Sequence, residues 1–271
     1  MSEIGTLQVE FRYLAKITGR LEYATDAMRA LDELLKIDTQ DGLYPTLINN
    51  IHLKPSFAND EISIGAMGDS FYEYLLKIWL QGGKKETKYR LLYDRAMKGI
   101  MDKLIHVSRP NYLTYVAELK YGQVIHKMDH LACFLGVSRS SYCSHSSFAQ
   151  ILTYSSLQGN LVLGAYTHPA GIQSKEAQRQ LKTGKQLAYT CYQMYARQSS
   201  GLSPEYVDFV NGKNDFEKGR NAPYYLLRPE VCETLFIIYH LTKDPVCKSL
   251  SVLLVLSLRS NTHNTLRSSR S

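Results

Sequence analysis

A helix–turn–helix pattern that occurs three times along the chain restricts its fold most strongly. Between Ile4 and Ile17, apolar residues recur at three- and four-residue spacings, and Gly19 then ends the predicted helix. The helices predicted in the three copies lie over 4–17 and 23–35, over 71–80 and 89–104, and over 231–241 with a further apolar stretch after it. This repetition is typical of αα-hairpins stacked side by side, so the sequence predicts an all-α fold. An unrelated helical bundle remains the alternative.

The net charge of +7 gathers at one end of the chain. The last 26 residues hold four basic and no acidic side chains: Lys248, Arg259, Arg267 and Arg270. The other 245 of the 271 residues therefore carry only 7 − 4 = +3. Proteins that bind nucleic acids usually concentrate basic side chains in a stripe with interleaved aromatics, whereas here the other lysines are scattered. We expect no nucleic-acid partner.

The sequence offers no segment for membrane insertion. No apolar run reaches the roughly 18 residues that a membrane-spanning helix needs. The first residues, Met1 to Ile4, have neither the basic start nor the apolar stretch of a signal peptide. We therefore expect no membrane segment, signal or anchor in this chain.

Two segments lack the helical periodicity of their surroundings. Residues 136–158 are rich in serine, and residues 245–271 change abruptly to Ser, Leu and Arg after Asp244. Both are interpreted as insertions or reading-frame artefacts, and the tail is expected to be disordered. The remaining part of 1–244 is taken as the folded domain.

Acidic residues stand where several predicted helices begin. Glu73 follows Asp69 by one helical turn, Glu233 follows Glu230 by three residues, and Glu205 ends the segment Gly-Leu-Ser-Pro-Glu. Each residue alone is explained by helix capping, because carboxylates near a helix N-terminus are favoured. Three clusters with aromatic and Arg neighbours favour a shared acidic site, which suits a carbohydrate and the acid–base cleavage of a glycosidic bond.

Other chemistries have no comparable motif. The chain lacks the G-x-x-x-x-G-K-[ST] and G-x-G-x-x-G patterns of nucleotide binding. Its five cysteines form no C-x-x-C pair, its eight histidines are dispersed, and H-E-x-x-H is absent, which argues against zinc. A serine nucleophile would need a G-x-S-x-G motif, which is also absent.

Five motifs, in matching order, resemble signatures of the class I α-1,2-mannosidases, glycoside hydrolase family 47. They are AMGDSFYEYLLK at 66–77, KMDHLACF at 127–134, TCYQM at 190–194, GLSPE at 201–205 and LLRPE at 226–230. The resemblance covers roughly 1–244 without the Ser-rich segment. It implies a partial (αα)7 barrel of helical hairpins with small β-hairpin loops, and inverting hydrolysis of terminal α-1,2-linked mannose from high-mannose N-glycans.

The resemblance also assigns roles to individual residues. Asp69, Glu205 and Glu230 match acidic residues of the catalytic centre, with Glu230 as the base that activates water. The residues that match the lining of the cleavage subsite are Glu3, Glu73, Arg228 and Glu233, and those that match the family disulfide are Cys133 and Cys191. The family implies a monomer in the secretory pathway, in the endoplasmic reticulum or Golgi. Its cofactor is Ca²⁺, which would hold sugar hydroxyls and the attacking water.

The chain departs from the family pattern in three places. A first acidic motif, in a Phe-Glu-containing helix, is missing, and so is the Thr-Glu-Ala-His-Pro stretch whose Thr binds Ca²⁺, so no metal ligand is assigned. We therefore expect little or no activity from this chain alone; the alternatives are a non-catalytic glycan-binding protein and a non-functional fragment. Met67 stands where some members have an Arg, which favours Golgi-like trimming over the single-linkage trimming of the endoplasmic reticulum.

Overall fold

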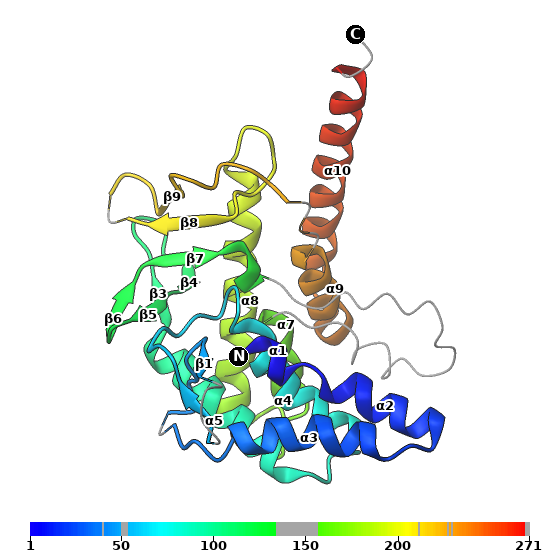
Figure 1. The fold of residues 1–271 in the computed structure, drawn as a ribbon. Helices are drawn as coiled ribbons and strands as arrows, with labels where there is room; N and C mark the ends of the chain where they lie inside the picture. Colours follow the sequence, from blue (N-terminus) through cyan, green and yellow to red (C-terminus); the bar gives the residue numbers. More distant parts are fainter. Residues whose placement is uncertain are drawn as a thin grey trace. The chain divides into compact units, whose positions relative to one another are not determined.

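The computed structural model describes most of the chain in two compact units (Figure 1). The described residues are 1–39, 41–49, 54–133, 157–210, 212–226, 228 and 230–268, of which 157–159, 230, 258 and 260–268 are described by their backbone only. Unit 1 comprises Met1–Ile105 and Ala117–Ile125, and unit 2 comprises His106–Val116 and His126–Ser271. Most of the Ser-rich segment 136–158 thus lies outside the described residues.

Unit 1 contains the first two predicted helical hairpins. Its helices are α1 (Ser2–Gly5), α2 (Gln8–Thr18), α3 (Glu22–Leu34), α4 (Asp69–Gln81) and α5 (Thr87–Lys103). Gly19 ends α2 in the left-handed conformation with φ 71°, and Gly83, with φ 64°, lies in the turn between α4 and α5. The α2–α3 and α4–α5 hairpins are confirmed, with α3 and α4 each beginning within two residues of the predicted start.

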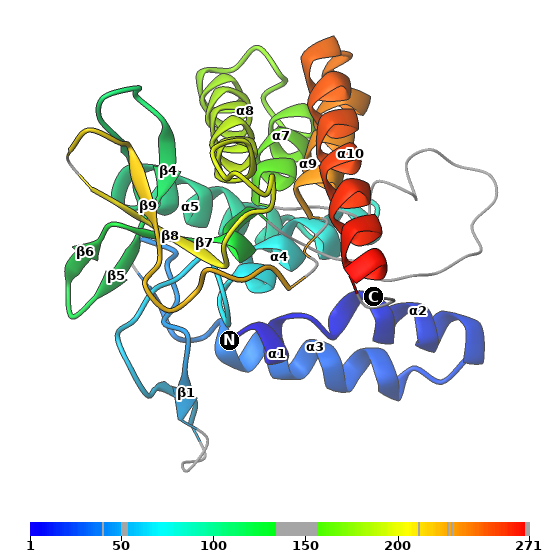
Figure 2. The same cartoon turned by 90° about the horizontal axis from the view of Figure 1, so that it is seen from above.

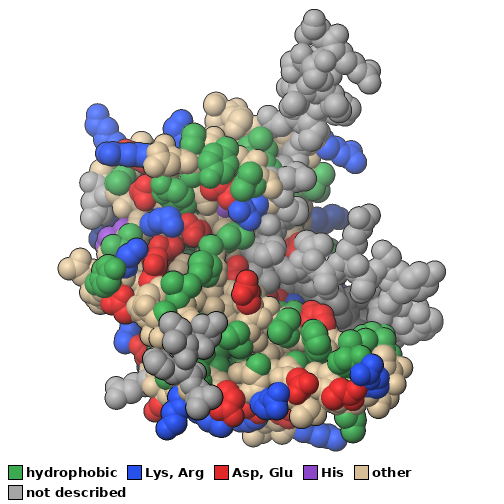
Figure 3. Space-filling view, in the orientation of Figure 1, with side chains coloured by type: hydrophobic (Ala, Val, Ile, Leu, Met, Phe, Trp, Pro, Cys, Tyr) green, Lys and Arg blue, Asp and Glu red, His purple; other side chains and the backbone are tan. Residues whose placement is uncertain are grey.

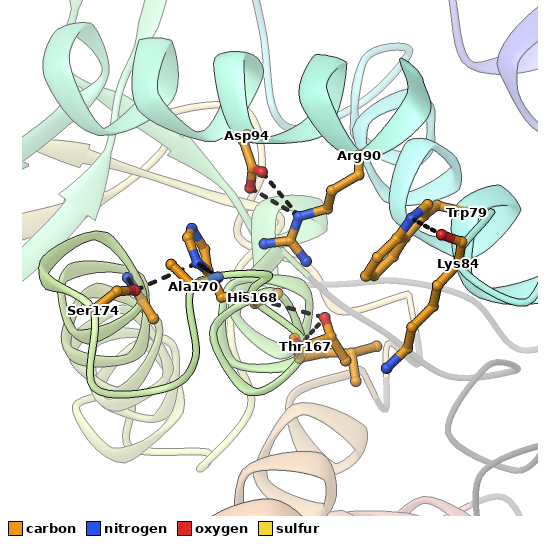
Figure 4. A network of polar contacts seen from close by, with 11 residues as sticks. Trp79, Lys84, Arg90, Asp94, Thr167, His168, Ala170 and Ser174 are labelled. Carbon is orange, nitrogen blue, oxygen red and sulfur yellow. Dashed lines mark hydrogen bonds and ion pairs between the residues drawn. The ribbon is translucent and has the colours of Figure 1, made fainter. Parts of the chain in front are cut away.

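Helix α4 is the centre of unit 1. Its residues from Ser70 to Leu80 are all buried, because other elements cover every side of this largely apolar helix. Helix α5 packs against it, and the Arg90 guanidinium of α5 lies 5.1 Å from the ring of Trp79 in α4 (Figure 4). Within α5, Arg90 Nε donates to both carboxylate oxygens of Asp94, at 3.1 and 2.9 Å. Helices α2 and α3 bury fewer side chains, and Leu21 between them is 74% exposed.

Short antiparallel strand pairs complete unit 1. Strands β1 (Ile48–Asn49) and β2 (Ser56–Phe57) form one pair, and β5 (Glu118–Lys120) and β6 (Gln123–Ile125) form a hairpin. An isolated bridge joins Ile62 to Leu119 in β5. Strand β3 (Ile105–Val107) pairs with β4 (Thr114–Val116). Apart from Ile105, both strands belong to unit 2. The small β-hairpin loops that the family resemblance implies are therefore present.

Unit 2 combines a small sheet with two further helical hairpins (Figure 2). The sheet has the antiparallel order β7 (Lys127–Asp129), β8 (Tyr206–Phe209), β9 (Phe216–Lys218), and the 3₁₀ helix η1 (His130–Cys133) follows β7 directly. The helices are α7 (Leu157–Tyr166), α8 (Lys175–Ala196), α9 (Glu230–Thr242) and α10 (Pro245–Ser268). The α9–α10 hairpin confirms the third predicted repeat.

The α7–α8 hairpin has no counterpart in the predicted helices. Ser174 caps α8 by accepting a hydrogen bond from the Ala177 backbone N–H at 3.3 Å, and Ser174 Oγ lies 3.4 Å from His168 Nδ1 in the turn before it (Figure 4). The tail also differs from the sequence expectation: the structure describes 245–268 as a helix rather than as a disordered segment. Cys247 and Leu254 of this helix are buried. Packing against α9 gives α10 a partner that the sequence pattern does not show.

The surface of both units is chemically mixed. On the face that Figure 3 shows, acidic and basic side chains are interspersed with hydrophobic ones. Among the described residues, no helix has the length and hydropathy required to cross a membrane.

Candidate active site

Asp69, the first residue of α4, is held by the start of its own helix and by α1. Its Oδ1 accepts hydrogen bonds from the Ser70 backbone N–H at 2.7 Å, from Ser70 Oγ at 3.2 Å and from Ser2 Oγ at 3.0 Å. A Cβ on the preceding Gly68 would lie 2.0 Å from the Ser63 carbonyl oxygen, so only glycine fits here. Burial raises the pKa of Asp69 above its ordinary value, and the hydrogen bonds only partly oppose this.

A pocket of about 310 Å³ lies beside this helix start. Ser2, Glu3, Thr46 and Met67 contribute to its wall. Ser2 therefore faces the pocket and also donates to Asp69, while the Met67 carbonyl accepts from the Ser2 backbone N–H at 3.0 Å. Met67 has φ 72° and is half-exposed. The structure thus brings together Glu3, Met67 and the Ser2–Asp69 contact in unit 1.

Glu73 lies one turn further along α4, in the interior of unit 1. It is 2% exposed and forms an ion pair with Lys77, which is also buried, on the next turn. The Lys77 ammonium also lies 5.3 Å from the ring of Tyr74. Glu73 does not contribute to the wall of the pocket that contains Glu3.

Glu205, in unit 2, stands directly before strand β8. Its backbone carbonyl accepts from the His130 N–H at 2.8 Å, and its own N–H donates to the Ala222 carbonyl at 3.2 Å. The side chain pairs with Arg228, whose Nε and one terminal nitrogen both donate to Glu205 Oε2, at 2.7 and 2.6 Å. The Leu226 backbone N–H donates to Oε1 at 3.2 Å. Both oxygens are therefore oriented by the segment that leads into α9.

Three aromatic side chains fix the backbone at Arg228. The hydroxyls of Tyr195 and Tyr225 both donate to the Arg228 carbonyl, at 2.8 and 2.9 Å. His130 Nε2 lies 2.7 Å from the Tyr195 hydroxyl, and because that hydroxyl donates onward, Nε2 carries the imidazole proton. Burial lowers the pKa of His130 to about 3, and the Arg228 charge adds to this, so the imidazole is neutral at neutral pH.

The first residue of α9 is Glu230, two positions after Arg228, and its side chain lies outside the described atoms. Glu233 follows on the same helix and is half-buried. Within unit 2 the structure therefore brings Glu205 into contact with Arg228 and attaches both to the segment that enters α9. Asp69, Glu3 and Glu73 belong to unit 1, so each unit carries part of the predicted site.

The predicted disulfide between Cys133 and Cys191 is confirmed. It joins η1 to α8 across a sequence separation of 58 residues, with a Cα–Cα distance of 5.9 Å. Thr234 of α9, itself fully buried, donates to the Cys133 carbonyl at 3.3 Å. The disulfide and this hydrogen bond link the three elements that carry His130, Tyr195 and the start of α9.

Sequence reasoning missed a second acidic centre in unit 2. Asp215 is fully buried and accepts from Ser108 Oγ at 2.6 Å, from the backbone N–H and Nδ2 of Asn111 at 2.9 and 2.7 Å, and from Arg197 at 2.8 Å. Burial alone would raise the pKa of Asp215, but these hydrogen bonds outweigh it and hold that pKa well below its usual range. The partners come from distant parts of the chain, so no local motif marks them.

The described residues do not form a recognisable metal centre. No group of three or more His, Cys, Asp or Glu side chains among them could hold a metal ion. The carboxylates with known partners are bound to Arg, Lys, hydroxyl or backbone N–H donors rather than grouped together. The described part of the chain therefore shows no carboxylate cluster of the kind that many Ca²⁺ sites use.

Comparison with known proteins identifies relatives of one kind. The chain is 38% identical over 245 residues to the mannosyl-oligosaccharide alpha-1,2-mannosidase IA of Spodoptera frugiperda, covering 90% of this chain and 32% of that protein. The endoplasmic reticulum mannosyl-oligosaccharide 1,2-alpha-mannosidase of Schizosaccharomyces pombe is 35% identical, covering 90% of this chain and 45% of that protein. The chain thus spans roughly a third to under half of the relatives it matches.

The fold is also similar to that of a solved structure. The structure matches an alpha-1,2-mannosidase from Trichoderma reesei with a TM-score of 0.75 and 24% identity, covering 94% of this chain and 50% of that one. The family model for glycosyl hydrolase family 47 matches residues 1–267, which extends beyond Asp244 into α10. A match over nearly the whole chain, together with these relatives, means that the chain belongs to glycosyl hydrolase family 47.

Proposed function

We propose that this chain carries part of the sugar-binding and catalytic centre of an α-1,2-mannosidase that removes terminal α-1,2-linked mannose from high-mannose N-glycans with inversion. The family match over 1–267 is the observation that carries the proposal. Mannosyl-oligosaccharide substrates are named for the relatives from several organisms. On this view the helical hairpins are part of an (αα)7 barrel, and the protein acts in the secretory pathway, in the endoplasmic reticulum or Golgi.

The proposed catalytic residues are Asp69, Glu205 and Glu230. Glu230 is the base that activates water, and it stands at a helix start that the Arg228 network anchors. The raised pKa of Asp69 favours its protonated form and supports a role on the acid side of the reaction. An inverting enzyme needs its acid and base carboxyl groups about 6.5–9.5 Å apart, so that a water molecule fits between them and the sugar.

The proposed cleavage subsite contains Glu3, Glu73, Arg228 and Glu233. Glu3 supports this role by facing the pocket beside α4. Arg228 orients the Glu205 carboxylate through two hydrogen bonds to one oxygen, which leaves acceptor capacity on the other for a sugar hydroxyl. Met67, also in the wall of that pocket, supports the Golgi-like preference because a thioether cannot make the bidentate contacts of an Arg.

Ca²⁺ is expected from the family resemblance, but the described residues contain no cluster of three or more His, Cys, Asp or Glu side chains to hold it. No step of the proposal therefore runs through a metal ion. The catalytic groups are the carboxyl groups of Asp69, Glu205 and Glu230.

Hydrolysis of a high-mannose N-glycan, followed by proton NMR with and without Ca²⁺, tests the proposal. We expect slow mannose release at most from this chain alone, with the β anomer appearing first and with release abolished in Glu230→Gln. Brisk release would contradict the low activity. Release of the α anomer first, or undiminished release by Glu230→Gln, would contradict the mechanism.

The same samples separate the alternatives. Glycan-array binding without hydrolysis, lost in Glu230→Gln, would favour a non-catalytic glycan-binding protein. Neither binding nor release, with a broad and non-cooperative thermal unfolding curve, would favour a non-functional fragment.

A further inference from the structure

A second pocket lies in unit 2, on the side of helix α8 and away from the Glu205–Arg228 pair. Its volume is about 290 Å³. The loop between β3 and β4 forms one wall with Asn111 and Tyr112, and one face of α8 forms the other with Lys185, Gln186 and Tyr189. Strand β4 contacts α8 beside it (Figure 2). Gln186 precedes Tyr195 of the candidate site by nine residues of one helix, which is about 14 Å along the axis.

The two tyrosines of this pocket have exposed aromatic rings. Tyr112 is 62% exposed and Tyr189 is 50% exposed. Tyr112 has φ 59°, a left-handed conformation that is rare for a bulky residue. The Arg109 guanidinium lies 4.4 Å from the centre of the Tyr112 ring and covers one of its faces. Each ring thus offers apolar surface that protein atoms leave at least partly uncovered.

The loop that carries Tyr112 is held firmly. Asn111 donates twice to the buried Asp215, through its backbone N–H and through Nδ2. Leu113 and Ser108 exchange hydrogen bonds, with the Leu113 N–H donating to Ser108 Oγ at 3.0 Å and the Ser108 N–H donating to the Leu113 carbonyl at 2.9 Å. Thr190 of α8 donates to the Thr114 carbonyl at 2.6 Å. A wall fixed in this way loses little conformational freedom when a ligand binds.

The described residues that line the pocket carry one charge, and that charge is paired; the Arg109 guanidinium against Tyr112 is a second positive charge close to the pocket. Lys185 is the charged side chain among the described residues that line it, and its ammonium pairs with Asp244 at 3.0 Å. Asn111 and Gln186 add uncharged amide groups, which can donate to and accept from hydroxyls. Exposed aromatic faces with amide groups beside them suit a polar but uncharged ring with apolar C–H faces.

We propose that the pocket between Tyr112 and Tyr189 is an accessory binding site for neutral carbohydrate, large enough for one or two sugar units. The tyrosine rings pack against the C–H faces of the sugar, and the amides of Asn111 and Gln186 bond its hydroxyls. The site does not take part in hydrolysis; it retains another part of the same glycan or a neighbouring one. The inference rests on the proposed function only in the choice of mannose as the probe.

Calorimetric and saturation-transfer NMR titrations of the full chain with methyl α-D-mannoside and α-1,2-mannobiose test this site. The test variants are Tyr112→Asn, because Asn tolerates the left-handed conformation, and Tyr189→Ala on the exposed face of α8. The matched control is Tyr121→Asn, since Tyr121 is also exposed and left-handed, with φ 52°, but lies in the β5–β6 turn of unit 1. Glu230→Gln serves as the active-site control.

We expect each test variant to weaken binding about three- to tenfold, as loss of one aromatic contact implies, while Tyr121→Asn leaves it unchanged. In Glu230→Gln any binding at the candidate active site is lost, and the binding that depends on Tyr112 and Tyr189 remains. Thermal unfolding of the test variants should match that of the control. Wild-type affinity in both test variants, or no detectable binding by the wild type, would overturn the proposal. Tighter binding of glucuronate than of mannoside would overturn the assignment to a neutral sugar. Loss of all sugar binding in Glu230→Gln would place the only sugar site at the candidate active site and would also overturn it.

Discussion

Asp215 and Glu205, both in unit 2, each pair with an arginine, and the surroundings of these two carboxylates differ in one decisive respect. Asp215 is fully buried, and its two oxygens accept four hydrogen bonds, which fills the acceptor capacity of a carboxylate. Glu205 has a side chain 12% exposed, and Arg228 occupies one oxygen while the other accepts a single backbone N–H. The Asp215 carboxylate, whose acceptor capacity is used up, holds a loop in place. The Glu205 carboxylate has spare acceptor capacity and can accept a hydrogen bond from a ligand hydroxyl.

Removing the charge of Asp215 should have the largest effect on stability. In Asp215→Asn an amide NH₂ replaces one acceptor oxygen and faces donors from Asn111, Ser108 or Arg197. We expect the free energy of unfolding to fall by about 3–5 kcal/mol, because a buried network of four hydrogen bonds is disrupted and at least one buried donor is left unsatisfied. Urea titration followed by circular dichroism measures this. Glu205→Gln is the comparison variant and should cost about 1 kcal/mol at most; equal losses in both variants would remove the distinction between the two carboxylates.

Reduction of the Cys133–Cys191 disulfide should have the next largest effect. Breaking a native disulfide lowers the free energy of unfolding by about 2–4 kcal/mol. Because η1 carries His130 beside the bond, reduction should loosen the Glu205 region before the Asp215 loop. Hydrogen exchange under reducing conditions measures this order, through the amide protons of His130 and Asn111. Faster exchange at Asn111 first would contradict it.

Mild acid should produce a smaller effect, again on the Glu205 side. The folded pKa of His130, about 3, lies below the ordinary unfolded value near 6.5, so the unfolded state binds the proton first as the pH falls. The His130 contribution is therefore complete above about pH 6.5 and is lost progressively towards pH 3. Asp215, with a depressed pKa, keeps its full contribution down to about pH 4 and loses it only below that.

Between pH 6.5 and 5.5 the free energy of unfolding should fall by about 1 kcal/mol through His130. Denaturant titrations at the two pH values measure this. The loss should disappear in His130→Asn and persist in His168→Asn, a half-buried histidine in the α7–α8 turn. A pH dependence that is the same in His130→Asn and in the wild type would contradict the assignment.

Local sequence patterns predicted the parts of the molecule whose determinants are close together in the chain. The spacing of apolar residues and the glycine at 19 were sufficient for the α2–α3 hairpin. Helix α10 was anticipated only as the apolar stretch that ends the third repeat. The helix through the Ser-, Leu- and Arg-rich tail was missed, because it depends on packing against α9, which buries Leu254 in a segment with no clear amphipathic face. The α7–α8 hairpin was missed as well, although the Ser174 cap was a usable signal.

The supporting residues of the candidate site could not be predicted for a related reason. Tyr195 meets His130 across 65 residues, and Ser108 meets Asp215 across 107. No spacing rule connects residues so far apart. The acidic residues themselves were found because helix starts and the family motifs mark them locally, and the disulfide was found through the motifs alone.

The central claim is that Glu205 and Arg228 form part of a sugar-binding centre. Titration of the Glu205→Gln variant with a high-mannose N-glycan tests it most directly, and urea denaturation of the same sample shows whether the variant is folded. Our account predicts binding at least about tenfold weaker than in the wild type, as expected when a charged hydrogen-bonding group is lost, with the free energy of unfolding changed by about 1 kcal/mol or less. Glycan affinity equal to that of the wild type in a folded Glu205→Gln variant would contradict it.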